Sequence, residues 1–255
     1  MGANVHFKFS VADVILDVSC CFQSTYVRCR DFLVGDDAVP HGSIHITTED
    51  LEAEKKLLLS KKEAGQQLMA STPQSLEFLV LCRKTAEILP HHGAALFHGS
   101  ALAFDGQGVL FTATSGTGKS THSSIWRTVY GDRVYMVNDD KPFLKVSGNQ
   151  VYVCGSPWMG KHQLGRNVCV PLKGICVLNR GLENRIDPIS GRDAMPLLIQ
   201  QTYRPETPAA LVRSMAILDT VSRYTSLYQI FCNMEAEAAQ VVCRKIFFES
   251  KENML

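Results

Sequence analysis

The sequence lacks a strong net charge. Its 26 Lys and Arg residues nearly balance its 25 Asp and Glu residues, so the formal net charge is +1. Without a basic field, the composition does not favour binding to nucleic acid or to an anionic membrane. The chain also has no apolar run that approaches the roughly 18 residues of a membrane-spanning helix. Its first residues lack the apolar segment of a secretory signal and the myristoylation pattern. We therefore expect a cytoplasmic protein that binds neither membranes nor nucleic acid.

The sequence also lacks the cysteine patterns of metal sites. None of its nine cysteines belongs to a Cys-x-x-Cys pair, and no Cys and His grouping has the spacing of a zinc site. Their odd number and the apolar surroundings of several favour reduced, mostly buried thiols. With 255 residues, 45% of them hydrophobic and 20% charged, the chain is long enough to bury a sizeable core.

One octet carries most of the functional information. Residues 113–120 are Ala-Thr-Ser-Gly-Thr-Gly-Lys-Ser, which matches the Walker A pattern G-x-x-x-x-G-K-[ST] except at Ala113. The apolar run 108–113 predicts a buried strand, and residues 121–129, which lack Gly and Pro, predict a helix. A phosphate-binding loop (P-loop) needs this order, because inward-turned N–H groups and the helix N-terminus face the phosphates. The sequence therefore predicts that the chain binds ATP.

The residue types in this loop predict separate roles. Lys119 would neutralise the β- and γ-phosphates, and the Ser120 hydroxyl would bind Mg²⁺. If position 113 needed a positive φ, Ala113 would be strained by roughly 1 kcal/mol, which the sequence leaves open. His122, on the first turn of the following helix, is expected to face solvent. The complete set of predicted nucleotide-binding residues is Ser115, Gly116, Thr117, Gly118, Lys119, Ser120 and Thr121.

Two adjacent carboxylates follow the next strand-like run. Residues 134–138 are apolar and end at Asp139 and Asp140. A parallel neighbouring strand would bring both carboxylates beside Ser120 at the carboxyl edge of the sheet, where open α/β sheets bind ligands. One carboxylate could then hold Mg²⁺ while the other accepts the proton of an attacking hydroxyl. The alternative is a polar strand end before a turn at residues 141–142.

Between His98 and Asp140 the chain resembles the HPr kinase/phosphorylase family. The similar segments are residues 98–120, which include the P-loop, and Val-Asn-Asp-Asp at 137–140. The stretch 115–120 is also similar to ATP-type phosphoenolpyruvate carboxykinases. The resemblance implies an α/β fold with a P-loop kinase core, and it implies that His98 works with the acidic pair. Residues 121–126 depart from the family pattern, so the resemblance implies a reaction class, and the identity of the substrate is what transfers least from the family.

These observations predict an ATP- and Mg²⁺-dependent kinase that transfers the γ-phosphoryl group to a hydroxyl. Asp139, assisted by His98, is the candidate base, and Asp140 is the candidate metal ligand beside Ser120. The resemblance favours a serine of a protein or peptide as acceptor. A small-molecule kinase and a nucleotide-binding protein without transfer chemistry remain alternatives. A decarboxylating carboxykinase is the least favoured, because the chain is much shorter than that family. The sequence is also compatible with a homo-oligomer.

A glycine-rich segment at residues 155–167 is the candidate substrate loop. It carries Lys161, His162 and Arg166 between two strand-like runs, and long loops at sheet edges often bind substrates. Lys161 or Arg166 could clamp the transferring phosphoryl group, although the sequence does not rank them. The alternative is a solvated connection.

The chain is predicted to divide near residue 70. Residues 1–70 contain strand-like runs at 5–9, 11–18 and 43–47 and are interpreted as a β-rich accessory lobe. Residues 52–67 are either a helix or a connection. Thr72 and Pro73 then have the types expected at the start of a helix, and residues 71–255 form the predicted kinase core.

Overall fold

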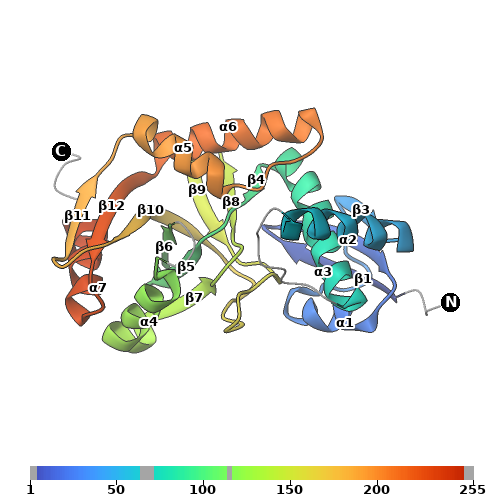
Figure 1. The fold of residues 1–255 in the computed structure, drawn as a ribbon, viewed down its shortest axis with the longest axis horizontal. Helices are drawn as coiled ribbons and strands as arrows, with labels where there is room; N and C mark the ends of the chain where they lie inside the picture. The colour runs from blue at the N-terminus through green and yellow to red at the C-terminus, as the bar shows by residue number, and fades with distance from the viewer. Residues whose placement is uncertain (1–4, 64–71, 114–116, 250–255) are drawn as a thin grey trace.

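The computed structural model describes residues 5–63, 72–113 and 117–249, which form a mixed α/β fold with two sheets (Figure 1). The first sheet has the order β1-β2-β3, with β1 antiparallel and β3 parallel to β2. Alternate residues of β1 and β2 are buried, as the period-two pattern of the sequence predicts. The bounds are β1 Val5–Val11, β2 Val14–Cys20 and β3 Gly42–His45.

A two-residue turn separates β1 from β2. Ala12 and Asp13 both have positive φ, 51° and 61°, as the common two-residue hairpin turns require. The interpretation of residues 11–18 as one strand was therefore wrong. Ala-Asp lacks the Asn-Gly or Asp-Gly chemistry that usually identifies such a turn in a sequence.

Three helices accompany the first sheet: α1 Gln23–Arg28, α2 Thr48–Glu63 and α3 Pro73–Ile88. The predicted start of α3 is confirmed, since the Thr72 hydroxyl accepts a hydrogen bond from the Ser75 N–H at 3.2 Å. Buried residues of α3 and of the first sheet belong to one hydrophobic cluster, which also includes Trp158. The predicted division near residue 70 stays a prediction. Residues of α3 and Trp158, which follow residue 70, complete the hydrophobic core of the N-terminal sheet.

The second sheet has the order β4-β8-β9-β10-β6-β5-β7, and β12 pairs with both β10 and β11. Strand β10 is the longest and pairs with β9 at its start and with β6 and β12 further on. The bounds are β4 Ala94–Leu96, β5 Ser100–Phe104, β6 Gln107–Thr112, β7 Val134–Asn138, β8 Phe143–Ser147, β9 Gln150–Cys154, β10 Cys169–Arg180, β11 Arg185–Pro188 and β12 Ser226–Cys232.

Strands β6 and β7 run in the same direction but are not neighbours. Strand β5 lies between them and is antiparallel to both. The expectation of adjacent parallel strands was therefore wrong, because residues 100–104 return between them as a hairpin partner of β6. The carboxyl ends of β6 and β7 still lie at the same edge of the sheet, one strand apart.

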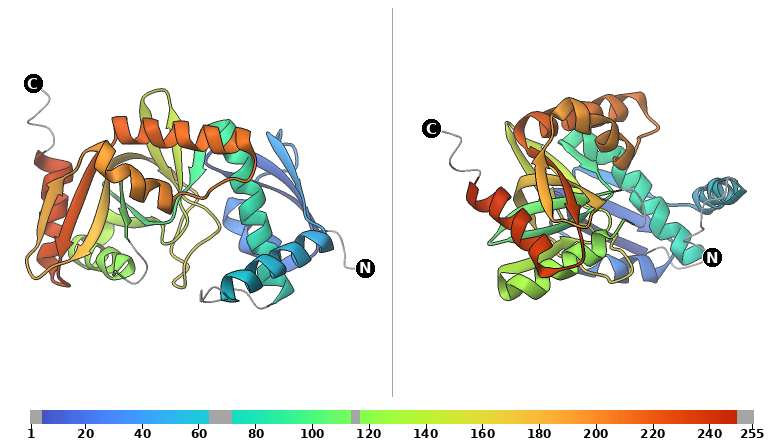
Figure 2. Two further views of the ribbon diagram at one scale, coloured as in Figure 1. Left: turned by 45° about the horizontal axis from the view of Figure 1, so that its top comes forward. Right: turned by 60° about the vertical axis from the view of Figure 1, so that its left-hand side comes forward.

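Helices cover both faces of the second sheet (Figures 1 and 2). Helices α5 and α6 pack on one face through Leu198, Leu218 and Val221. Helices α4 and α7 pack on the other through Trp126 and Val242. The bounds are α4 Lys119–Tyr130, α5 Gly191–Gln201, α6 Pro208–Tyr224 and α7 Ala236–Cys243. Among the described residues, no helix combines the length and apolar character needed to cross a membrane.

His122 is buried in the core rather than solvated, which corrects the expectation from the sequence. Its side chain is packed against Phe111 with ring centroids 4.6 Å apart, and the residue is 2% exposed. The Trp126 Nε1–H donates to His122 Nε2 at 3.1 Å. A proton on His122 Nε2 would therefore face the Trp126 N–H group, and solvent has little access to the buried ring to relieve the repulsion. Burial lowers the pKa of His122 from 6.5 to about 4.

We expect His122 to make the fold sensitive to acid. The unfolded chain binds its proton near pH 6.5, whereas the folded chain binds it only near pH 4, so stability falls as the pH decreases through this interval. The contribution is about 3 kcal/mol between pH 7 and pH 4. Urea unfolding of wild type and His122→Gln should show the difference, since glutamine can accept from Trp126 without titrating. The exposed His91→Gln control should keep the wild-type dependence; the same slope in His122→Gln would contradict the prediction.

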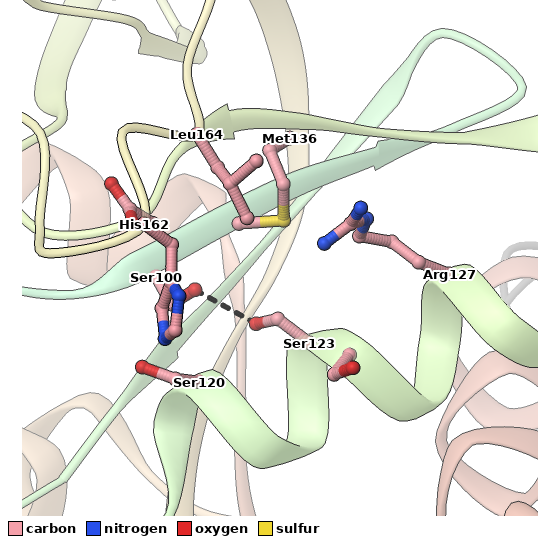
Figure 3. A pocket seen from close by; sticks show the side chains of 9 residues that line it. Ser100, Ser120, Ser123, Arg127, Met136, His162 and Leu164 are labelled. Atoms are coloured by element: carbon pink, nitrogen blue, oxygen red, sulfur yellow. Dashed lines mark hydrogen bonds between the residues drawn. The ribbon is translucent and has the colours of Figure 1, made fainter.

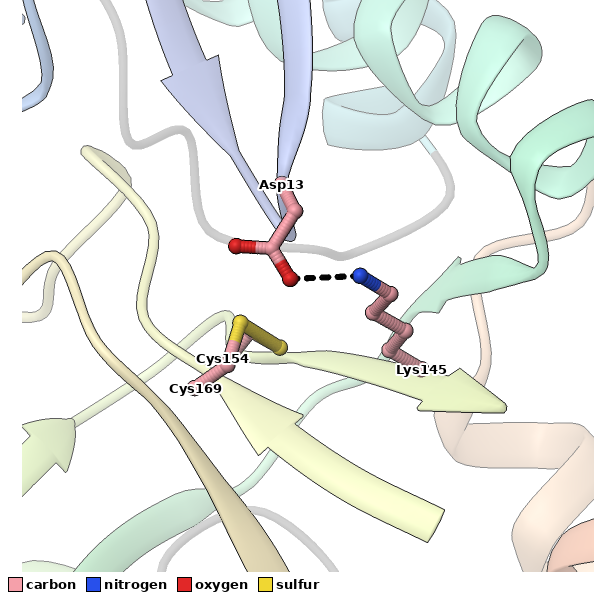
Figure 4. Close-up of a disulfide and its surroundings, with 4 residues drawn as sticks. All are labelled: Asp13, Lys145, Cys154 and Cys169. Atoms are coloured by element: carbon pink, nitrogen blue, oxygen red, sulfur yellow. Dashed lines mark hydrogen bonds and ion pairs between the residues drawn. A yellow bond between two sulfur atoms is a disulfide. The ribbon is translucent and has the colours of Figure 1, made fainter. Parts of the chain in front are cut away.

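A disulfide joins Cys154 and Cys169, so the expectation of reduced thiols was wrong for this pair (Figure 4). The two residues face each other in the β9–β10 ladder with their Cα atoms 4.1 Å apart. A sequence separation of 15 residues does not reveal this register. The other cysteines that the structure describes are free. The disulfide ties together the two ends of the candidate substrate loop. Nearby, Asp13 of the β1–β2 turn pairs with Lys145 of β8 (Figure 4).

Candidate active site

The predicted phosphate loop connects β6, which ends at Thr112, to α4, which begins at Lys119. Ser115 and Gly116 lie outside the described residues, whereas Thr117, Gly118, Lys119, Ser120 and Thr121 are described. Gly118 precedes α4 with φ 119°, a conformation that favours glycine. Ala113 is buried and is not among the residues with positive φ, so its methyl group introduces no backbone strain.

Lys119 is the first residue of α4, and its side chain turns back toward the preceding strand. Its Nζ donates to the Ala113 carbonyl at 3.3 Å. Burial lowers the pKa of Lys119, and the nearby Asp140 carboxylate opposes this by raising it. The ammonium group therefore lies between the strand end and the acidic pair.

Asn138 fixes the acidic pair, a role that the sequence did not suggest. Its side chain is fully buried, and its Oδ1 accepts the N–H groups of Asp140 and Lys141 at 2.8 and 2.6 Å. Its Nδ2 donates to the Ser156 carbonyl at 3.0 Å. These bonds hold the chain as it leaves β7 and attach it to the start of the candidate substrate loop.

The two carboxylates have different surroundings. Asp139 Oδ1 accepts the Gly160 N–H at 2.7 Å, and a β-carbon at position 160 would lie 3.1 Å from Asp139 Oδ2. Asp140 faces two cationic or titratable groups: its Oδ1 lies 3.4 Å from His98 Nε2, and its Oδ2 pairs with Lys141. In the described part of the chain, only Asp140 of the two has such ion-pair partners.

His98 lies beside Asp140, whereas the sequence interpretation paired it with Asp139. Burial lowers the pKa of His98, and the positive charge of Lys119 lowers it further, against the opposing effect of Asp140. The imidazole is therefore neutral near pH 7 and stays neutral further into the acid range than an ordinary histidine.

The segment between β9 and β10 is attached to the end of β7. The Arg166 N–H donates to the Val137 carbonyl at 3.1 Å, and the Gly155 N–H to the Val168 carbonyl at 2.9 Å. A β-carbon at Gly155 would lie 1.8 Å from the Arg166 carbonyl oxygen, so the two arms of the loop approach too closely for any side chain there. This attachment brings the tip of the loop to the acidic pair.

The structure separates the three candidate substrate residues. Lys161 and His162 are exposed and line a cavity of about 680 Å³ beside the acidic pair. The Arg166 guanidinium lies instead over the Tyr135 ring, 4.7 Å from its centroid, and does not line that cavity. Lys161 is therefore the stronger candidate of the two basic residues.

This cavity brings together all four predicted catalytic residues. His98, Lys119, Asp139 and Asp140 line it together with Ser120. Further lining residues, which the sequence did not suggest, come from the N-terminal helices and from the start of the candidate substrate loop. They include Arg28, Ser75, Phe78, Leu79, Pro157, Trp158 and Met159.

A smaller cavity of about 110 Å³ shares Ser120, Asp139 and His162 with the larger one (Figure 3). The hydroxyls of Ser100 and Ser123 are 2.7 Å apart in its wall, and Arg127 enters from α4. Its size suits a few water molecules rather than an acceptor residue. The larger cavity is therefore the candidate site for substrates.

The donor atoms at this edge fit a magnesium ion. Ser120, Asp139 and Asp140 offer hard oxygen ligands in one cavity, which Mg²⁺ prefers over nitrogen and sulfur. Within the described ranges, no group of three or more His, Cys, Asp or Glu side chains is arranged to hold a metal. An ion here would take its remaining ligands from water and phosphate oxygens, as Mg²⁺ commonly does.

Comparisons with known proteins find distant likenesses among solved structures only. No family model and no curated protein matches the chain. Among solved structures, it is similar to the Hpr(Ser) kinase/phosphatase from Coxiella burnetii, with 14% sequence identity and a TM-score of 0.35. The match covers 62% of this chain and 97% of that chain. This is a distant structural relation, and it carries no conclusion about activity.

Proposed function

We propose that this protein is a cytoplasmic ATP- and Mg²⁺-dependent kinase with a P-loop core of the HPr kinase and phosphoenolpyruvate carboxykinase type. It transfers the γ-phosphoryl group to a serine hydroxyl of a protein or peptide. The observation that carries the proposal is the convergence of Lys119, Ser120, Asp139 and Asp140 on one cavity. A Walker A lysine and serine beside two carboxylates is the set that phosphoryl transfer requires.

In the proposed reaction, Asp139 accepts the proton of the attacking serine hydroxyl. The serine oxygen bonds to the γ-phosphorus, the bond to the β–γ bridging oxygen breaks, and ADP leaves with its electron pair. The hydroxyl proton passes to Asp139, whose Oδ2 has no hydrogen-bond partner among the described residues. Asp140 is less suited to be the base, because Lys141 and His98 face its oxygens.

The remaining groups position and neutralise the nucleotide. Lys119 would contact the β- and γ-phosphates, and Ser120 with Asp140 would hold Mg²⁺, which supplies charge neutralisation to the phosphates when bound. His98 then acts on the metal-binding carboxylate rather than on the base. Its neutral imidazole adds no positive charge to Asp140, whose carboxylate stays available to a cation.

Binding of Mg²⁺-ATP is expected to stabilise the fold. A ligand present at a hundred times its dissociation constant should raise the free energy of unfolding by about 2.7 kcal/mol. Thermal unfolding with ATP at several Mg²⁺ concentrations measures this, with Mg²⁺ alone as the control. An unchanged melting temperature at every Mg²⁺ concentration would reject the nucleotide site.

A further inference from the structure

The N-terminal helices supply one wall of the substrate cavity, and that wall carries an arginine. Arg28 ends α1, and its guanidinium lies over the Phe78 ring of α3, 4.9 Å from the centroid. Phe78 packs against Trp158 with ring centroids 5.9 Å apart, and the Trp158 Nε1–H donates to the Phe78 carbonyl at 3.0 Å. The Arg28 guanidinium thus lies on the cavity wall over an aromatic ring, which leaves its charge without a carboxylate partner among the residues that the structure describes.

This wall is continuous with the candidate base. Trp158 lies two residues before Gly160, whose N–H binds Asp139. Trp158 also belongs to the hydrophobic cluster of the N-terminal sheet, where it packs against Phe9 at 6.3 Å between ring centroids. The Phe78 and Trp158 part of the wall, on which Arg28 lies, is therefore connected to Asp139 through packed groups. A substrate in the cavity can contact both Arg28 and Asp139, since both line it.

The cavity has more positive than negative side chains. Of the described residues that line it, four are Lys or Arg and two are Asp. Lys141 pairs with Asp140, and Lys119 would be occupied by phosphates. No ion pair to a carboxylate involves Arg28 or Lys161 in the described part of the chain. Two exposed cations at the rim remain for the acceptor.

We infer that Arg28 recognises a carboxylate of the acceptor, and that this carboxylate is an acidic side chain of the peptide that presents its serine to Asp139. The inference rests on the proposed function. A guanidinium can donate two parallel hydrogen bonds to one carboxylate, so the contact orients the carboxylate as well as neutralising its charge. The exposed rim at Arg28, Lys161 and His162 leaves the cavity open to solvent, so an extended chain can enter and leave. The apolar wall of Phe78 and Trp158 suits its remaining side chains.

The test uses peptides with blocked ends and one central serine. Three glutamates precede the serine in one peptide and follow it in another, and matched peptides carry glutamine or lysine instead. Transfer from γ-labelled ATP gives kcat/KM for each. Wild type is expected to prefer one glutamate peptide over its glutamine partner by at least about tenfold. Arg28→Glu should abolish that preference and favour the lysine peptide, and Arg28→Gln should remove it without reversal.

Arg30→Glu is the matched control. Arg30 is exposed two residues further along, faces Asp31 at 3.6 Å, and does not line the cavity, so its reversal should leave the wild-type preference intact. An unchanged preference in Arg28→Glu would overturn the inference and leave the kinase proposal standing. Mg²⁺-ATP binding without transfer to any of the peptides would overturn the peptide acceptor. Loss of both binding and transfer would reject the proposed function itself.

Discussion

Asp139→Asn is expected to lower kcat by roughly 10²–10⁴-fold and to change ATP affinity little. Asparagine keeps the size of the side chain, and its Oδ1 can still accept the Gly160 N–H that Asp139 accepts at 2.7 Å. The substitution therefore removes proton acceptance while preserving the position of the group. Steady-state transfer from γ-labelled ATP to the serine peptides, together with ATP titration by thermal shift, measures the two effects separately.

Asp140→Asn is the comparison for that experiment. Asp140 faces His98 and Lys141, so its loss should weaken Mg²⁺-dependent nucleotide binding more than it lowers the rate at saturating Mg²⁺. If both variants lose only metal affinity, Asp139 is not the base. If Asp140→Asn alone lowers kcat at saturating Mg²⁺, the two roles are exchanged.

Lys119→Ala is expected to reduce transfer strongly, by roughly 10²–10³-fold or more, because it removes a charge that would stabilise the transferring phosphoryl group. The ammonium group donates to the Ala113 carbonyl and is half-buried. No ion pair with a carboxylate involves it in the described ranges, so its removal leaves no buried acid unpaired. The fold should therefore survive the substitution.

Two further variants sharpen the result. Lys119→Arg keeps the positive charge but replaces the compact ammonium by a larger, planar guanidinium group. We expect this variant to recover little of the transfer activity. Lys173→Ala removes an exposed lysine of β10 that does not line the cavity, and it should retain wild-type transfer. Circular dichroism and the melting temperature without ATP establish that each variant is folded. Wild-type transfer by Lys119→Ala would show that the octet at 113–120 is only a turn.

Local chemistry made several elements predictable. The strand at residues 107–112 and the helix at residues 119–130 flank the octet, as its pattern predicts. The Thr72 cap of α3 is also present. Each depends on interactions between residues close in sequence, where side-chain type determines the allowed backbone. The turn at Ala12 and Asp13 escaped prediction because neither residue type requires positive φ.

Residue types and their spacing were enough to select the residues proposed for nucleotide chemistry: the lysine and serine of the octet, the acidic pair and the histidine upstream. Tertiary structure decided their pairing. It inserted β5 between β6 and β7, placed His98 on Asp140, and separated Lys161 from Arg166. It also joined Cys154 to Cys169 and brought Arg28 to the substrate cavity. These relations depend on strand register and on packing between distant segments, and neither residue type nor spacing along the chain specifies them.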